Sequence, residues 1–168
     1  MALEHDKLLN LSTELGYQLM VSGAEIYRTE DSVGRLLRAY GLDSGEVFAI
    51  PNCLNVSVLG TGGEPMTRIR RIPPHGTNIE LLERYNALCR ELCRETPDYE
   101  EAMERLRAIP RNQKAYPLWL QMVGYYIGAF GFCLFFRGSF ADALISGLCG
   151  VAVGMCLTWM SRVGSNVF

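Results

Sequence analysis

Charged residues are almost absent from the last third of this chain. The sequence has 16 Lys and Arg and 18 Asp and Glu residues, and 31 of these lie in residues 1–116. The three that follow are Arg137, Asp142 and Arg162. Residues 117–136 and 143–161 are uncharged, and about 20 apolar residues cross the ~30 Å hydrocarbon layer of a membrane. Because soluble helices of this length normally have a polar face, the pattern predicts two membrane-spanning helices; the alternative is a buried hairpin of a larger soluble protein.

Residues that commonly carry catalysis are also scarce. There are two histidines: His5 lies near the N-terminus, and only His75, in a Pro-Gly turn, could act as a general base. The glycine-rich residues 60–65, GTGGEP, lack the Lys-Ser/Thr pair that completes a phosphate-binding loop. We therefore expect no enzyme and no ATP-binding site, and a membrane-tethered hydrolase with His75 as its base is kept as an alternative.

The six cysteines form neither a disulfide framework nor a metal site. Cys133, Cys149 and Cys156 lie in the predicted spans, where a thiol acts as a small apolar side chain. Cys89 and Cys93 share one helix face at four-residue spacing, but no cluster of histidines or carboxylates accompanies them. We expect this pair to pack in a core, and we predict no metal and no cofactor.

The charge balance of residues 1–116 does not suit nucleic acid. This part has 14 basic and 17 acidic residues, and no aromatic residues interleave with its arginines.

Basic residues do gather just before the first predicted span. They are Arg105, Arg107, Arg111 and Lys114. After that span stands Arg137 alone, opposed by Asp142, so the positive-inside bias predicts that residues 1–116 lie in the cytoplasm.

The pattern of apolar residues changes period twice within residues 1–116. A helical period runs through residues 6–22 and resumes after Gly23 until Gly41. Alternating, β-branched runs then predict strands near 46–51, 53–59 and 66–72, with Pro51 at an edge or bulge. Helical periods return at 78–95, capped by Asn78, and at 98–109. The predicted fold is an α+β domain, residues 1–116, with two helices, a three-stranded antiparallel sheet and two further helices. An all-α transmembrane hairpin, residues 117–168 with spans of about 117–136 and 143–161, follows it.

Two polar clusters stand out in the predicted α+β domain. The first lies near the start of the second helix and comprises Glu25, Arg28, Glu30 and Asp31. Their spacing allows ion pairs along a solvated helix face, which chemistry alone favours over a ligand site. The second comprises Arg68, Arg70 and Arg71 on the third strand. These arginines either pair with carboxylates from the helices or bind an anion by two-point contacts.

Small residues recur four apart in both predicted spans. The pairs are Gly124 and Gly128, Ala143 and Gly147, and Gly150 and Gly154. Such spacing lets helices pack closely in lipid, and two helices cannot use all these faces, so we infer a larger bundle completed by further sequence or other chains. Asp142 is interpreted as a cap at the start of the second span; the alternative is a place in a polar pathway.

The order of these features resembles the threonine/serine exporter family. The stretches that carry the resemblance are SGAEIYRTEDSVGRLLRAYG, FAIPNCLNVSV, TRIRRI and NIELLERYNALCR, and the resemblance extends over about residues 8–165. It implies a cytoplasmic α+β domain leading into a multi-helix membrane domain. Because large subunits of the family carry about five spans, we expect this chain to be truncated or completed by helices from elsewhere.

The resemblance also implies a function. We expect a subunit or fragment of an exporter of threonine and serine in the cell inner membrane, driven by the proton-motive force. Some split members of the family are associated with dicarboxylate export, succinate in particular, which is one alternative; a non-transporting scaffold is another. The expected partners are a small-molecule substrate, the lipid bilayer, a second membrane subunit and further copies of the chain.

Ten positions are expected to bind substrate or act as a gate. They are Glu25, Arg28, Glu30, Asp31, Arg68, Arg70, Arg71, Asn78, Asn86 and Arg90. All but Arg70 match motif positions of the family, as does Gly23. In this interpretation the arginines of the third strand and the carboxylates of the second helix form two halves of one polar surface.

Overall fold

The structure is a computed structural model that describes residues 2–60, 62–111 and 116–163. It contains two compact units, Met1–Gln113 and Lys114–Phe168, which are described separately below. Lys114, one of the basic residues expected before the first span, lies outside the described residues.

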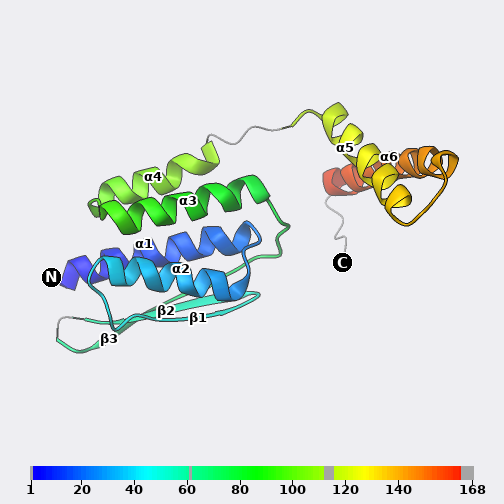
Figure 1. Cartoon of the computed structure of the whole chain (residues 1–168). Coiled ribbons are helices and arrows are strands. Elements are labelled where there is room, and N and C mark those ends of the chain that lie inside the picture. Colours follow the sequence, from blue (N-terminus) through cyan, green and yellow to red (C-terminus); the bar gives the residue numbers. More distant parts are fainter. Residues whose placement is uncertain (1, 61, 112–115, 164–168) are drawn as a thin grey trace. The chain divides into compact units, whose positions relative to one another are not determined.

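The first unit has three layers (Figure 1). Two helices, α1 (Ala2–Val21) and α2 (Ile26–Ala39), form the middle layer. On one side they cover an antiparallel sheet of β1 (Glu46–Ile50), β2 (Cys53–Leu59) and β3 (Pro65–Arg71), in the order β1-β2-β3. On the other side lie α3 (Ile79–Glu95) and α4 (Tyr99–Arg111). The predicted elements and their order are confirmed.

The middle layer has a core on each side. Leu11, Leu15 and Leu19 of α1 pack with α3 and α4, whereas Leu9 and Met20 pack with the sheet. Burying a fully enclosed leucine stabilises a fold by about 1.5–3 kcal/mol, so α1 anchors both layers. Ser12 and Thr13 of this helix are also buried, and their hydroxyls donate to the Leu9 carbonyl at 3.1 and 2.6 Å.

The sheet directs alternate residues toward the helices. Leu54, Val56 and Val58 of β2 are fully buried, and they stand opposite Arg70, Arg68 and Met66 of β3 in the antiparallel register. Pro51 was predicted at an edge or bulge of a strand and instead lies with Asn52 in the turn between β1 and β2. The strand ends at Ile50 because proline has no N–H to donate to the ladder.

A tight connection places the start of α2 beside the start of α3. Gly23 has a φ of 90°, its N–H donates to the Met20 carbonyl at 2.9 Å, and the Ala24 N–H donates to the Leu19 carbonyl at 3.0 Å. This is the glycine-terminated helix end predicted at Gly23. The side-chain oxygen of Asn78 accepts from the Leu81 N–H at 3.1 Å, and this contact confirms the predicted cap of α3.

The second unit is a helical hairpin of α5 (Leu118–Phe135) and α6 (Phe140–Val163). By length and composition, Leu118–Phe135 and Phe140–Met160 could each cross a membrane. The Asp142 carboxylate accepts from the N–H of Ser139 at 3.0 Å and from its hydroxyl at 2.6 Å, as in a capping box. The interpretation of Asp142 as a cap is therefore confirmed.

The glycines of the two helices have different surroundings. A side chain at Gly147 would meet the Tyr126 ring at 2.6 Å, and one at Gly150 would meet the Ala129 methyl at 2.7 Å, so these α6 glycines permit close contact with α5. A methyl at Gly124 or at Gly128 of α5 would meet nothing within 4 Å among the described residues.

Candidate functional site

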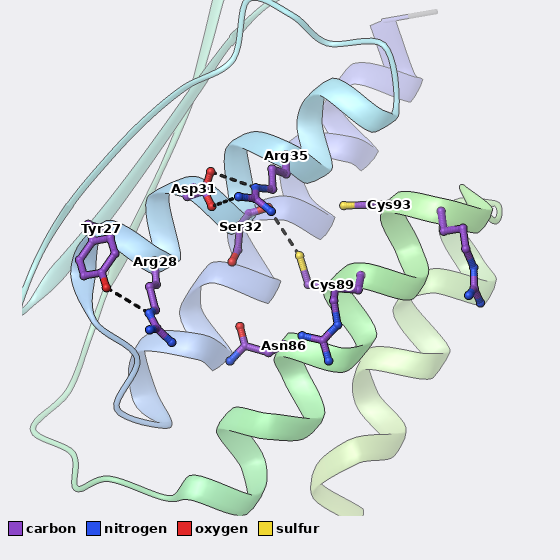
Figure 2. A pocket seen from close by; sticks show the side chains of 10 residues that line it. Tyr27, Arg28, Asp31, Ser32, Arg35, Asn86, Cys89 and Cys93 are labelled. Atoms are coloured by element: carbon purple, nitrogen blue, oxygen red, sulfur yellow. Dashed lines mark hydrogen bonds and ion pairs between the residues drawn. The ribbon is translucent and has the colours of Figure 1, made fainter.

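A groove of about 720 Å³ runs between α2 and α3 of the first unit. Figure 2 shows this groove, with side chains of both helices extending toward it. Its lining residues are Tyr27, Arg28, Asp31, Ser32 and Arg35 of α2, and Asn86, Cys89, Arg90, Cys93 and Arg94 of α3. Four arginines and one carboxylate therefore line it.

The α2 wall follows from helical spacing. Arg28, Asp31 and Arg35 lie three, four and seven positions apart, which places them on one face. Both carboxylate oxygens of Asp31 contact Arg35, at 3.0 Å to Nε and 2.8 Å to Nη2. Nε of Arg28 lies 3.2 Å from the Tyr27 hydroxyl and 3.2 Å from the carboxylate of Glu25. The ion pairs predicted along this helix are confirmed.

The α3 wall contains one arginine in an ion pair and one without a partner among the described residues. Asn86, Arg90 and Arg94 follow one another at four-residue steps, and the Asn86 amide donates to the Leu82 carbonyl at 2.8 Å. Nη2 of Arg94 lies 2.7 Å from the Glu95 carboxylate. Arg90 makes no ion pair and no hydrogen bond within the described part of the chain.

Two thiols lie between the walls. Cys89 is buried, and its Sγ is 3.6 Å from the Ser32 carbonyl oxygen; Cys93 is partly exposed. Burial raises the pKa of Cys89 to about 12 and raises the pKa of Cys93 as well. Both thiols are therefore protonated at neutral pH, and the charge of the groove comes from its arginines and Asp31.

A second cavity of about 240 Å³ adjoins this groove where α2 and α3 begin. It shares Arg28 and Asn86 with the groove and is also lined by Gly23, Glu25 and Thr77. The tight turn at Gly23 brings Thr77 and Glu25 to this point. Of the ten expected site residues, Arg28, Asp31, Asn86 and Arg90 line the groove, and Glu25 lies beside it.

The other expected residues lie elsewhere. Glu30 accepts the Ala49 N–H at 2.8 Å and fastens α2 to the edge strand β1, and Asn78 caps α3. Arg68 lies 2.9 Å from the Asp6 carboxylate and also contacts Asn10. Arg70 lies 3.1 Å from Glu14 and 4.5 Å from the centre of the Tyr17 ring. The expectation of one polar surface shared by α2 carboxylates and β3 arginines is wrong, because α1 supplies the partners of Arg68 and Arg70.

Arg71 points to the opposite face of β3 and lines a separate cavity with His75. Nδ1 of His75 lies 2.9 Å from the Pro73 carbonyl oxygen. Among the described residues, no serine hydroxyl and no cysteine thiol is hydrogen-bonded to His75. A hydrolase with His75 as its base would need a nucleophile beside this histidine, and the described residues place none in hydrogen-bond contact with it.

The groove also contains residues that the sequence did not single out as site residues. These are Tyr27, Ser32, Arg35, Cys89, Cys93 and Arg94. The signal for Arg94 was present, since it continues the four-residue step from Asn86 and Arg90. The signal for Cys89 and Cys93 was their shared helix face. Cys89 is buried and contacts the Ser32 carbonyl of α2, and Cys93 is partly buried against the same core.

Comparison with known proteins places this arrangement in a family. The family described as "Putative threonine/serine exporter" matches residues 10–168, which include both units. Proteins named pheromone-regulated membrane protein 10 are similar over 89% of this chain: the Yarrowia lipolytica protein is 30% identical, that of Candida albicans strain WO-1 26% and that of Saccharomyces cerevisiae 27%. No solved structure matches the chain.

The chain spans only 13%, 14% and 20% of the lengths of these three relatives. The match nevertheless runs from α1 to the end of the chain, through the arginine-lined groove and both apolar helices. The chain therefore belongs to the threonine/serine exporter family of membrane transporter-like proteins.

Proposed function

We propose that this chain is part of a gradient-driven exporter of threonine and serine, with its first unit in the cytoplasm. The observation that carries the proposal is the family match over residues 10–168, because it includes the α+β unit together with the two apolar helices. A protein with this composition has a soluble part that can meet a cytoplasmic solute and a lipid-embedded part that can form a path for it.

The hairpin alone presents too little surface for a path across a membrane. No described residue would lie within 4 Å of a methyl group at Gly124 or Gly128 of α5, and close packing of a further helix would fill this space. We infer that further transmembrane helices, from the same protein, a second membrane subunit or other copies, complete the path. The multi-pass topology in a cell inner membrane is part of this proposal.

The groove between α2 and α3 supplies the proposed gate or substrate-contacting surface. Arg28 and Arg90 stand on opposite walls, and Asn86 lies between the two cavities. A guanidinium binds a carboxylate or another anionic group through two parallel hydrogen bonds, so an anionic group bound there would join the two walls, as a gate requires. Glu30, Arg68, Arg70, Arg71 and Asn78 take no part in this groove and are proposed to support the fold around it.

The proposal is tested by solute accumulation. Cells that carry the complete transporter are fed a threonine dipeptide, and intracellular threonine is measured against cells lacking the gene. We expect higher intracellular threonine after deletion, and an equal rise when a protonophore collapses the gradient in cells with the transporter. Succinate is measured in parallel; a rise in succinate without a rise in threonine would transfer the function to dicarboxylate export.

A matched pair of variants separates transport from a scaffold role. Leu148→Arg places a charge within α6, at a cost of about 2.5–3.5 kcal/mol for insertion at a helix centre, and should abolish export. Leu59→Arg places the same charge on an exposed site of the sheet and should leave export intact. Unchanged threonine levels both after gene deletion and in the Leu148→Arg variant would exclude transport.

A further inference from the structure

The groove between α2 and α3 has an excess of hydrogen-bond donors over acceptors. Its lining includes four guanidinium groups and one carboxylate, and that carboxylate, Asp31, is engaged by Arg35 through both oxygens. The protonated thiols of Cys89 and Cys93 contribute no negative charge at neutral pH. An incoming cation would thus meet no unengaged carboxylate among the lining residues, whereas an incoming anion would meet several N–H groups.

The existing ion pairs leave much of this donor capacity unused. A guanidinium has five N–H donors. Arg28 uses Nε for Tyr27 and Glu25, Arg94 uses Nη2 for Glu95, and Arg90 makes no hydrogen bond or ion pair within the described part of the chain. These are solvent-exposed pairs, which contribute little and exchange partners readily. Figure 2 shows Arg28 and Asn86 extending into the same space between the helices.

The spacing of the donors selects for more than one anionic group. Arg28 and Arg35 are seven residues apart, about 10 Å along α2, and Arg90 and Arg94 are about 6 Å apart along α3. A monovalent anion can bridge one pair of arginines, but an anion with two charged ends can contact both walls. The volume of about 720 Å³ is within the range of small-molecule sites, roughly 300–1,000 Å³.

We propose that this groove binds a small anion that carries two or more carboxylate or phosphate groups. Arg90 is the principal unpaired donor, Arg28 and Arg94 complete the contacts across the groove, and Asn86 donates or accepts beside them. The inference goes beyond the export function, because the site lies wholly within the first unit and can bind a cytoplasmic ligand whatever solute crosses the membrane. Loss of export and loss of anion binding are therefore separately measurable.

The test uses the full chain purified in detergent, with Cys93 as a reporter within the groove. Succinate and pyrophosphate are the two divalent probes, and acetate at equal ionic strength is the monovalent control. Labelling of Cys93 by a small uncharged thiol reagent is followed by mass spectrometry, with the partly exposed Cys53 of the sheet as an internal reference. We expect saturable protection of Cys93 by at least one divalent probe, and no protection by acetate.

Two variants identify the donor. Arg90→Gln removes a cation that has no partner in the described fold, so the unit should remain folded while the apparent Kd rises about 10-fold or more, as expected for lost hydrogen bonds to a charged group. Arg38→Gln removes an exposed cation of α2 that does not line the groove, and the Kd should not change.

Each outcome of this experiment either supports or overturns anion binding in the groove. Preference for pyrophosphate assigns the site to a phosphate-bearing ligand, and preference for succinate assigns it to a dicarboxylate; both support the proposal. Equal protection by acetate, absence of protection by either divalent probe, or an equal Kd for Arg90→Gln and the unaltered chain would overturn it.

Discussion

A single glycine determines how the first unit turns between its helices. Gly23 combines a left-handed backbone with contact against Thr77: a methyl group there would lie 2.8 Å from the Thr77 hydroxyl and 2.9 Å from its Cα. Gly41 ends α2 with a nearly equal φ of 83°, but a methyl group there would meet nothing within 4 Å in the described structure. A side chain at Gly41 would therefore meet backbone strain alone, whereas one at Gly23 would meet both backbone strain and a steric conflict with Thr77.

Replacing these glycines by alanine should have unequal effects. Gly41→Ala carries the left-handed penalty alone, about 1–2 kcal/mol. Gly23→Ala adds a conflict with Thr77 and should lower the free energy of unfolding of the first unit by about 2–4 kcal/mol. Hydrogen exchange of the α2 and α3 amides measures this unit separately from the hairpin. Equal losses for both variants would mean that Thr77 moves aside without cost.

At the level of elements, the glycines of the two hairpin helices differ in their contacts. Gly147, Gly150 and Gly154 of α6 face α5 at distances that exclude a side chain, whereas Gly124 and Gly128 of α5 have no neighbour within 4 Å in the part of the chain that the structure describes. The same four-residue spacing thus marks an occupied contact on α6 and an unoccupied face on α5. Sequence spacing could not distinguish them, since both read as small residues one turn apart.

Single methyl groups should reveal this difference. Gly150→Ala places a carbon 2.7 Å from both the Ala129 methyl and the Tyr125 carbonyl oxygen, and should destabilise the hairpin by about 1–3 kcal/mol. Gly128→Ala meets no such contact among the described residues and should not destabilise the hairpin, because alanine is favoured over glycine inside a helix by about 1 kcal/mol. Unfolding in a titration with SDS is followed by the fluorescence of Trp119 and Trp159, which both lie in the hairpin. A larger loss for Gly128→Ala would contradict the observed α5–α6 contact.

Most elements could be predicted from sequence because their signals are local. The two periods of apolar residues, the glycine after α1 and the Asn78 cap each act within a few residues. The site was only partly predictable, because the packing of α2 on α3 brings Arg28 and Arg90 to one groove, and local spacing does not specify this packing. The partners of Arg68 and Arg70 also lie far away in sequence, at Asp6 and Glu14.

For the whole molecule, the proposed arrangement has one orientation across the membrane. Ala141, at the start of α6, is predicted to lie outside, and Asp43, before β1, is predicted to lie in the cytoplasm. In a background without native cysteines, a membrane-impermeant maleimide should label Ala141→Cys in intact spheroplasts. It should label Asp43→Cys only after permeabilisation. The reverse pattern would place the arginine-lined groove on the outer side.

The contact between Glu30 and the Ala49 N–H bears on how the molecule avoids self-association. β1 is an edge strand, and exposed edges offer unpaired amides to strands of other chains. Here a carboxylate already accepts one of these amides at 2.8 Å. A strand added at β1 would have to break the hydrogen bond between Ala49 and Glu30. The Glu30 carboxylate would then face the backbone carbonyls of the added strand. We therefore expect Glu30 to make the addition of a further strand at β1 less favourable.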